Sequence, residues 1–305
     1  MRNAIISEIH NQMKVNKNIY FLTGDLGYGL LEPLEEDFPE RFIDVGIAEQ
    51  NMVGMAAGLA LAGKKVYVYS IIPFVTMRCF EQIRNDVCYH DADVTILGVG
   101  SGLSYGILGS THFALEDIAI LRSLPNMTIF SPSDEKEALS GLDYFSNYHH
   151  PLYLRIGKKD EPVVFSGNYS FAFGKGVEIS IGDDYVVFAT GPIVSEVVKA
   201  VEEIFNLTKK RLTLISIPTI KPLDENYILE KCLGKKKIFT VEEHSVIGGL
   251  GSSIAEIISE KTVNIQLVRL GTKDLFVKSI GDQSYLRKIL GLDSKGITKT
   301  IINYL

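Results

Sequence analysis

The segment from Asp44 to Met52 carries the acidic residue that is best placed for chemistry. A strand-like run at 42–45 stops at Gly46, and a helical pattern begins near Glu49. This spacing places the carboxylate at the carboxyl end of a strand, which is the edge where open α/β sheets bind ligands. The same position would let Glu49 stabilise the dipole of its own helix, so spacing alone leaves a structural role open.

His112 is the second candidate for chemistry. It follows a stretch at 98–111 that contains glycine and serine, and it precedes a helical pattern that begins near Leu115. A polar group on a loop beyond a strand end is well placed to face a substrate. We expect the other five histidines to be non-catalytic, with His244 as an interface or structural residue; they are His10, His90, His149, His150 and His244.

Alternating strand and helix patterns must position these residues, and they predict two consecutive α/β domains, each a mostly parallel sheet flanked by helices. Near-continuous apolar runs, typical of strands buried on both faces, occur at 19–22, 66–69, 94–97, 185–189, 212–215, 238–241 and 265–268. Helical patterns occur at 49–62, 115–124 and 192–205. A charged stretch with weak periodicity separates the domains, which we place at 1–157 and 177–305 with a linker at 158–176.

The composition excludes several classes of protein. The chain has 305 residues, a net charge of −6 and no strongly basic segment, so no nucleic-acid partner is expected. Its three cysteines are too few and too scattered for a disulfide framework or a zinc site. Neither a signal pattern nor an apolar run of about 18 residues is visible, so we expect a cytoplasmic protein that does not enter membranes.

Motifs in the same order along the chain resemble the transketolase family. Gly46-Ile47-Ala48-Glu49-Gln50 resembles its pyrimidine-binding motif, which 1-deoxyxylulose-5-phosphate synthases share. Further blocks resemble the family at 70–84, at 111–126, at 131–134, at 152–155 and, in the second domain, at 241–252. The resemblance implies a pyrimidine-binding fold followed by a transketolase C-terminal fold.

The resemblance also implies thiamine diphosphate as the cofactor. Glu49 would hydrogen-bond the aminopyrimidine ring and share a proton with it, so that the thiazolium loses a proton and can hold a carbanion. An apolar setting from Ile47, Met52 and Met55 would favour a protonated Glu49. His112 would donate to the substrate carbonyl or shuttle a proton.

Further site residues follow from the same resemblance. Ile47, Phe74, Val75 and Arg78 are candidate cofactor contacts. Val75 replaces a residue that is more often aromatic in the family, a loss for which Phe74 would compensate. Arg155 and Arg2 are candidate phosphate ligands, since both align with basic positions of the family and a guanidinium suits bidentate phosphate contact. Gly100 stands where the family has a further phosphate-binding histidine, which counts against a phosphorylated substrate.

Two features point to the substrate and to a partner. Leu108 stands four residues before His112, where many family members have an acid that reads hydroxyl groups, so we expect a different substrate near that carbon. The Gly-Asp-Gly motif that holds the diphosphate through a metal is missing: Gly24-Asp25-Leu26 is only a chance likeness, and Asp25 remains a candidate substrate contact. An N-terminal subunit would then bind the diphosphate and Mg²⁺ (or Ca²⁺), leaving no metal site on this chain and giving an α2β2 assembly in which this chain self-associates.

Three alternatives remain open. A β subunit of a 2-oxo-acid dehydrogenase E1 component has the same layout, and lipoyl-domain transfer would support it. Synthesis of 1-deoxyxylulose 5-phosphate from pyruvate is the second. A non-catalytic partner-binding subunit is the third, against which the presence of Glu49 and His112 counts.

Overall fold

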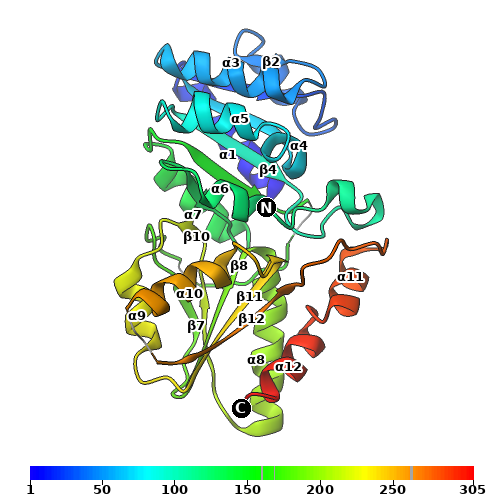
Figure 1. Ribbon diagram of the computed structural model, residues 1–305. Coiled ribbons are helices and arrows are strands. Elements are labelled where there is room, and N and C mark those ends of the chain that lie inside the picture. The colour runs from blue at the N-terminus through cyan, green and yellow to red at the C-terminus, as the bar shows by residue number, and fades with distance from the viewer. Residues whose placement is uncertain (159–160, 168, 262–263) are drawn as a thin grey trace.

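The computed structural model describes residues 1–158, 161–167, 169–261 and 264–305. Figure 1 shows two α/β domains stacked end to end, with the chain entering at the first and ending in the second. The N-terminal elements are α1 (Arg2–Val15), β1 (Ile19–Thr23), α2 (Glu32–Asp37), β2 (Phe42–Asp44), α3 (Glu49–Leu61), β3 (Lys65–Ile71), α4 (Ile72–Thr76), α5 (Phe80–Gln82), η1 (Ile83–Cys88), β4 (Val94–Val99), η2 (Gly106–Leu108), η3 (Ser110–His112), α6 (Asp117–Arg122), β5 (Thr128–Phe130), α7 (Glu135–Phe145) and β6 (Leu152–Ile156).

The C-terminal domain continues the alternation of strands and helices, as predicted. Its elements are β7 (Val177–Ser180), β8 (Tyr185–Thr190), η4 (Gly191–Ile193), α8 (Val194–Thr208), β9 (Thr213–Ser216), β10 (Thr219–Lys221), α9 (Glu225–Cys232), β11 (Lys237–Ser245), α10 (Leu250–Glu260), β12 (Gln266–Thr272), α11 (Gln283–Leu290) and α12 (Ser294–Ile302).

The first sheet has seven strands in the order β10-β5-β6-β4-β3-β1-β2. All its pairs are parallel except β10 with β5, where Thr219 lies opposite Phe130. The edge strand β10 follows β9 of the second sheet in the chain, so one short strand crosses from the second domain to complete the first sheet. The predicted boundaries at 157 and 177 remain predictions.

Both faces of the first sheet are covered, which confirms the expectation from the continuous apolar runs. Every residue of β3 and β4 is buried. One core joins the sheet to α3 and α6 through residues such as Val53 and Ile118. The other joins it to α1, α2 and α7 through residues such as Ile9, Leu34 and Leu142.

The second sheet is also mostly parallel and covered on both faces. Its order is β12-β11-β8-β9-β7, and β7 pairs with β9 in the antiparallel direction. Helices α8 and α12 cover one face, with Val197 and Ile301 in the core. Helices α9 and α10 cover the other, with Ile228 and Ile254 buried there.

One predicted helix is shorter than expected. The helical pattern at 115–124 forms α6 only from Asp117 to Arg122. The Ala114 N–H bonds the Gly102 carbonyl at 2.9 Å, and the Leu115 carbonyl accepts from the Ser245 N–H at 2.8 Å. These contacts with distant segments keep the residues before Asp117 out of the helix, which local periodicity does not reveal.

The N-terminal end of α7 holds the segment that joins the two domains. Asp134 caps this helix through the Glu137 N–H, and its Oδ2 atom accepts from the N–H groups of Val164 and Phe165, each at 2.8 Å. The fully buried Glu137 accepts from the Tyr169 hydroxyl at 2.9 Å. These hydrogen bonds therefore attach the predicted linker at 158–176 to the first domain. Positions 159, 160 and 168 of this linker lie outside the described residues.

Glu137 predicts a pH dependence of stability. Burial raises the pKa of Glu137 to about 7, against hydrogen bonds donated by the Ser133 N–H and hydroxyl. The folded state then binds more protons than the unfolded state between the two pKa values, so stability falls as pH rises from about 4.5 to about 7. The full loss is roughly 3 kcal/mol.

The Glu137→Gln variant is expected to lack this loss. Chemical denaturation at pH 5 and at pH 8 gives the free energy of unfolding of each protein at both pH values. The decrease between pH 5 and pH 8 should be larger in the wild-type protein than in Glu137→Gln. Parallel curves for the two proteins would contradict the prediction.

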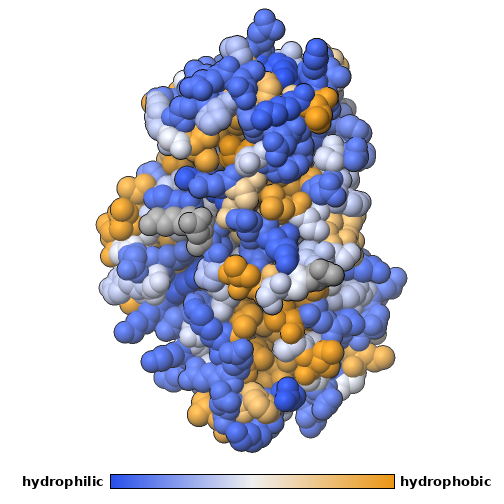
Figure 2. All heavy atoms as spheres, turned by 180° about the vertical axis from the view of Figure 1, so that it is seen from behind, coloured by the Kyte–Doolittle hydropathy of each residue, from blue (hydrophilic) through white to orange (hydrophobic). Residues whose placement is uncertain are grey.

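The surface exposes several large apolar side chains near the loops at the carboxyl edge of the first sheet. Tyr28 is 81 % exposed, Ile107 is 67 % exposed and Phe276 is 77 % exposed. On the face seen in Figure 2, hydrophobic residues gather in more than one patch instead of being scattered singly. Contiguous exposed apolar patches are typical of surfaces that bind a partner or a ligand. No helix within the described part of the chain is long and apolar enough to cross a membrane.

Candidate active site

Loops that follow five neighbouring parallel strands meet at one edge of the first sheet. The strands lie in the order β6-β4-β3-β1-β2. The loop after β2 leads to Glu49, β3 leads to Phe74, β4 leads to His112 and β6 leads to Lys158. Because parallel strands end at the same edge, residues far apart in the sequence converge there.

Glu49 is the first residue of α3 and is only 2 % exposed. Arg78 Nη1 donates to Glu49 Oε2 at 2.5 Å, and the Arg78 side chain is 45 % exposed. Of the three residues expected to supply an apolar setting, Met52 is fully buried, whereas Ile47 is 77 % exposed and Met55 is 37 % exposed. The group that the structure places on this carboxyl oxygen is the Arg78 guanidinium.

Asp44 ties the loop before Glu49 to its neighbour. Its Oδ1 atom accepts from the N–H groups of Asp25 and Gly46, each at 2.9 Å. The Asp25 carboxylate in turn accepts from the Tyr28 hydroxyl. Asp25 therefore lies at the same edge as Glu49, and its contact with substrate stays a prediction.

The loop after β3 presents an aromatic face beside Glu49. Arg78 Cζ lies 4.9 Å from the centroid of the partly buried Phe74 ring. Val75 is fully buried among core residues of the opposite face, including Ile72 and Ile83. The expected cofactor contact of Val75 is not supported, because the short helix α4 turns this side chain into the core while Phe74 faces the site.

His112 packs against aromatic rings from two elements. Its ring centroid lies 5.1 Å from that of Phe74, in an edge-on arrangement, and 5.9 Å from that of Tyr105. Tyr105 occupies the space beside Gly100, where a Cβ atom would lie 2.1 Å from its ring and where φ is +94°. The glycine at position 100 is thus required by this loop. The contacts run from Glu49 through Arg78 and Phe74 to His112, so the structure joins the two predicted chemical residues in one site.

Lys158 is a site residue that the sequence analysis missed. Its Nζ atom lies 4.4 Å from the Tyr105 ring centroid. Burial lowers the pKa of His112, and the positive charge of Lys158 lowers it further. Lys158 also lines a cavity of about 370 Å³ with Ser104 and Arg287. The signal for Lys158 is its position two residues beyond the end of β6, within the predicted linker.

The Lys158→Met variant is expected to raise the pKa of His112, because it removes the positive charge that disfavours the imidazolium. NMR titration of the histidine ring protons in the full chain measures the change, with His112→Asn identifying the signal. Lys199→Met, which removes a lysine that is paired with Glu196 on α8, is the control and should leave this titration unchanged. An unchanged or lower pKa of His112 in Lys158→Met would contradict the arrangement.

Arg155 lies below the site instead of in it. It is 2 % exposed, and its Nε atom donates to Asp117 Oδ2 at 2.7 Å. Burial by itself would raise the pKa of Asp117, but the Arg155 charge reverses this and holds that pKa below its usual value. The predicted phosphate contact of Arg155 is not supported, because its guanidinium is buried and engaged within the protein.

Arg2 and Leu108 are the remaining predicted site residues. Arg2 is half-buried and hydrogen-bonds Tyr69. Burial raises the pKa of Tyr69, and Arg2 partly opposes this rise. Leu108 is 46 % exposed on the loop that carries His112. Among the described residues, no group of three or more His, Cys, Asp or Glu side chains is placed to hold a metal ion.

Comparison with known proteins places both domains. Residues 1–162 match the model of the transketolase pyrimidine-binding domain, and residues 174–297 match that of the transketolase C-terminal domain. The chain is 37 % identical to a subunit of the apulose-4-phosphate transketolase of Actinobacillus succinogenes, covering 88 % of this chain and 86 % of that protein. It is also 37 % identical to a putative transketolase C-terminal section of Methanocaldococcus jannaschii, covering 95 % of this chain and 91 % of that protein.

A solved structure has the same fold over the whole chain. It is described as a split gene transketolase in an inactive β4 tetramer. The two chains superpose with a TM-score of 0.88 at 31 % identity, covering 99 % of this chain and 96 % of that one.

Proposed function

Because this chain belongs to the transketolase family, we propose that it is one of the subunits of a split transketolase that transfers a two-carbon ketol unit between sugar or sugar-phosphate substrates. The observation that carries the proposal is the continuous group Glu49, Arg78, Phe74 and His112 at the sheet edge.

The residues present fit the pyrimidine of thiamine diphosphate. A buried carboxyl group can, when protonated, donate a hydrogen bond to a ring nitrogen, and the Phe74 ring, which Arg78 links to Glu49, offers a flat apolar face. Glu49 and Phe74 would hold the ring, with the exposed Ile47 at its rim. When bound, the cofactor supplies a thiazolium carbon that attacks a ketone and stores the electron pair of the transferred unit.

Glu49 acts by holding a proton at the carboxyl oxygen that faces the pyrimidine. In the chain alone, Arg78 Nη1 occupies Oε2 of this carboxylate. We propose that Arg78 gives up this contact when the pyrimidine binds, which its exposed side chain permits. The freed carboxyl group is then available for proton exchange.

His112 and Lys158 act on the substrate. The imidazole of His112 would donate to the substrate carbonyl oxygen, and its lowered pKa keeps it largely neutral near pH 7. The Lys158 ammonium, beside the Tyr105 ring, would attract an anionic group such as a phosphate. We propose Lys158 for this role in place of Arg155, with Arg2 as a further candidate.

Leu108 supports a substrate with fewer hydroxyl groups near one carbon, because leucine cannot accept a hydrogen bond. Rates for matched deoxy and hydroxylated substrate pairs test this. Equal preference for standard ketose phosphates would contradict it.

We further propose that the diphosphate and its Mg²⁺ (or Ca²⁺) are held by a different, N-terminal polypeptide in an α2β2 assembly. Relatives are named as one part of a transketolase, either a subunit or a C-terminal section, and a similar chain is described as an inactive β4 tetramer. Exposed apolar side chains, among them Tyr28 and Phe276, supply surface for such contacts. Three buried thiols support a cytoplasmic location; they belong to Cys79, Cys88 and Cys232.

The test combines this chain with its N-terminal partner, thiamine diphosphate and Mg²⁺, and screens ketose donors with aldose acceptors. Ketol transfer by the pair and by neither chain alone is the expected result. Reductive acylation of a lipoyl domain would support the dehydrogenase alternative, and pyruvate as the required donor would support 1-deoxyxylulose-5-phosphate synthesis. Absence of any turnover by the complete complex would favour a non-catalytic role.

A further inference from the structure

The loop that carries His112 is closed at its neck by one acidic residue of the second domain. Gly102 and Ala114 form an antiparallel bridge at this neck. The Leu103 N–H donates to Glu243 Oε1 at 2.6 Å. Arg155 Nη2 donates to the carbonyl oxygens of Ala114, at 2.8 Å, and Glu243, at 3.2 Å. The residue at position 243 therefore holds both sides of the neck.

The Glu243 carboxylate is itself fixed by the second domain. Arg287 Nε donates to Oε2 at 2.5 Å, and Gln283 Nε2 donates to Oε1 at 2.8 Å. Glu243 is only 4 % exposed. A buried carboxylate with a guanidinium, an amide and a backbone N–H as donors has few alternative positions.

The same region of the second domain contacts the loop beyond its neck. Gln283 Nε2 also lies 3.3 Å from Ser104 Oγ. The Ser110 hydroxyl, two residues before His112, donates to the Val277 carbonyl. Contacts from the second domain thus flank both Tyr105 and His112.

We propose that Glu243 is a positioning residue for His112: it fixes the neck of the loop so that the imidazole stays packed against Phe74 and Tyr105. The effect on catalysis rests on the proposed function, whereas the position of the ring does not. A displacement of about 1 Å at a catalytic group can lower the rate about a hundredfold.

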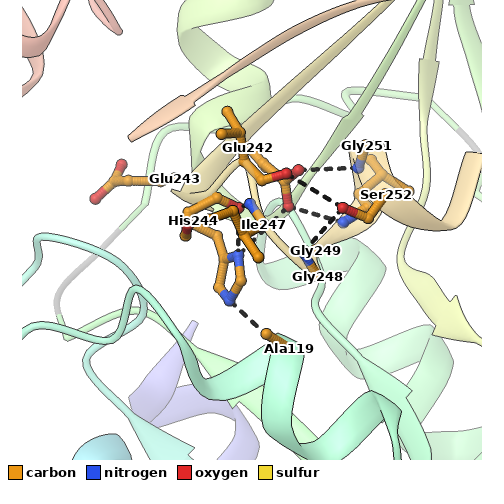
Figure 3. A network of polar contacts seen from close by, with 12 residues as sticks. Ala119, Glu242, Glu243, His244, Ile247, Gly248, Gly249, Gly251 and Ser252 are labelled. Atoms are coloured by element: carbon orange, nitrogen blue, oxygen red, sulfur yellow. Dashed lines mark hydrogen bonds and ion pairs between the residues drawn. The ribbon is translucent and has the colours of Figure 1, made fainter. Parts of the chain in front are cut away.

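The neighbouring acid offers a matched control. Glu242 is 1 % exposed, and it accepts from the N–H groups of Leu250 and Gly251 at the start of α10. Figure 3 shows Glu242 directed toward Gly251 and Glu243 directed away from it. Glu242→Gln and Glu243→Gln therefore make the same change at equally buried positions, but only Glu243 contacts the loop.

The first measurement is the NMR spectrum of the His112 ring protons in the full chain. In Glu243→Gln the new NH2 group must face either Arg287 or the Leu103 N–H, so one donor is set against another in either orientation. The neck should then shift, and the His112 signals should move as the contacts of the ring with Phe74 and Tyr105 change. In Glu242→Gln the same signals should stay at their wild-type positions. Unmoved signals in a folded Glu243→Gln protein, or equal movement in both variants, would overturn the proposal.

The second measurement uses the complex with its partner. We expect Glu243→Gln to lower kcat/KM for the sugar substrate roughly 10- to 100-fold. The Kd for thiamine diphosphate should be unchanged, because Glu243 has no described contact with Glu49 or Phe74. An equal loss of cofactor binding would overturn the proposal. If the wild-type complex transfers no ketol unit, the proposed function fails while the NMR measurement still tests the positioning.

Gly102→Ala provides an independent route if Glu243→Gln does not fold. Its φ is +60°, and a Cβ atom would lie 2.5 Å from Glu243 Oε1, so the substitution separates the same neck. The His112 signals should move in this variant as well. Unmoved signals in folded Gly102→Ala would contradict the proposed clamp.

Discussion

Replacing Glu49 with glutamine is expected to lower turnover of the assembled enzyme at least about a thousandfold, while leaving the fold intact. Glutamine has nearly the same volume as glutamate but has no carboxylic proton to exchange. The carboxyl group lies at the start of α3 and is 2 % exposed, so solvent cannot readily replace it. Steady-state ketol transfer and thermal unfolding, measured on the same preparation, check the prediction.

Glu32→Gln is the control for this variant. Glu32 is the first residue of α2 and accepts from the Gly29 N–H, so it makes the same chemical change at another helix start in the same domain. Its turnover should stay close to that of the wild-type protein. Near-normal turnover in Glu49→Gln would remove the role proposed for this acid.

Replacing Arg155 with methionine is expected to destabilise the fold by about 3–5 kcal/mol. The change leaves the fully buried Asp117 carboxylate without its cationic partner. It also removes the N–H donor that the carbonyl oxygens of Ala114 and Glu243 share. Chemical denaturation measures the loss. The double variant Arg155→Met/Asp117→Asn should be more stable than Arg155→Met, because no unpaired charge remains buried.

Arg122→Met tests whether burial causes this cost. Arg122 forms two hydrogen bonds with Glu256 and donates to the Gly248 carbonyl, but its side chain is 21 % exposed and that of Glu256 is 54 % exposed, whereas Arg155 and Asp117 are buried. Its loss should cost no more than about 1 kcal/mol. If Arg155→Met kept its stability and only raised the KM for phosphorylated substrates, Arg155 would be a phosphate ligand after all.

The sequence determined the features that depend on neighbours along the chain. The apolar runs at 66–69 and 94–97 are strands within β3 and β4, and the stop at Gly46 marks the turn into α3. The placement of Glu49 at a strand end and a helix start followed from this spacing alone. The role of Glu49 in chemistry was predicted from several motifs in the same order along the chain. The five residues at 46–50 indicate a function only together with the other family-like segments, such as 111–126 and 241–252.

Only the tertiary structure decided which side chains meet. It placed Arg78 on Glu49, turned Val75 inward, brought Lys158 to His112 and buried Arg155 against Asp117. These contacts join different strand ends across the sheet, and their partners lie between 29 and 46 positions apart in the sequence. Local periodicity fixes how a segment folds, but such pairs depend on strand order and on the packing of the second domain, so the sequence by itself could not distinguish a buried arginine from one that waits for a phosphate.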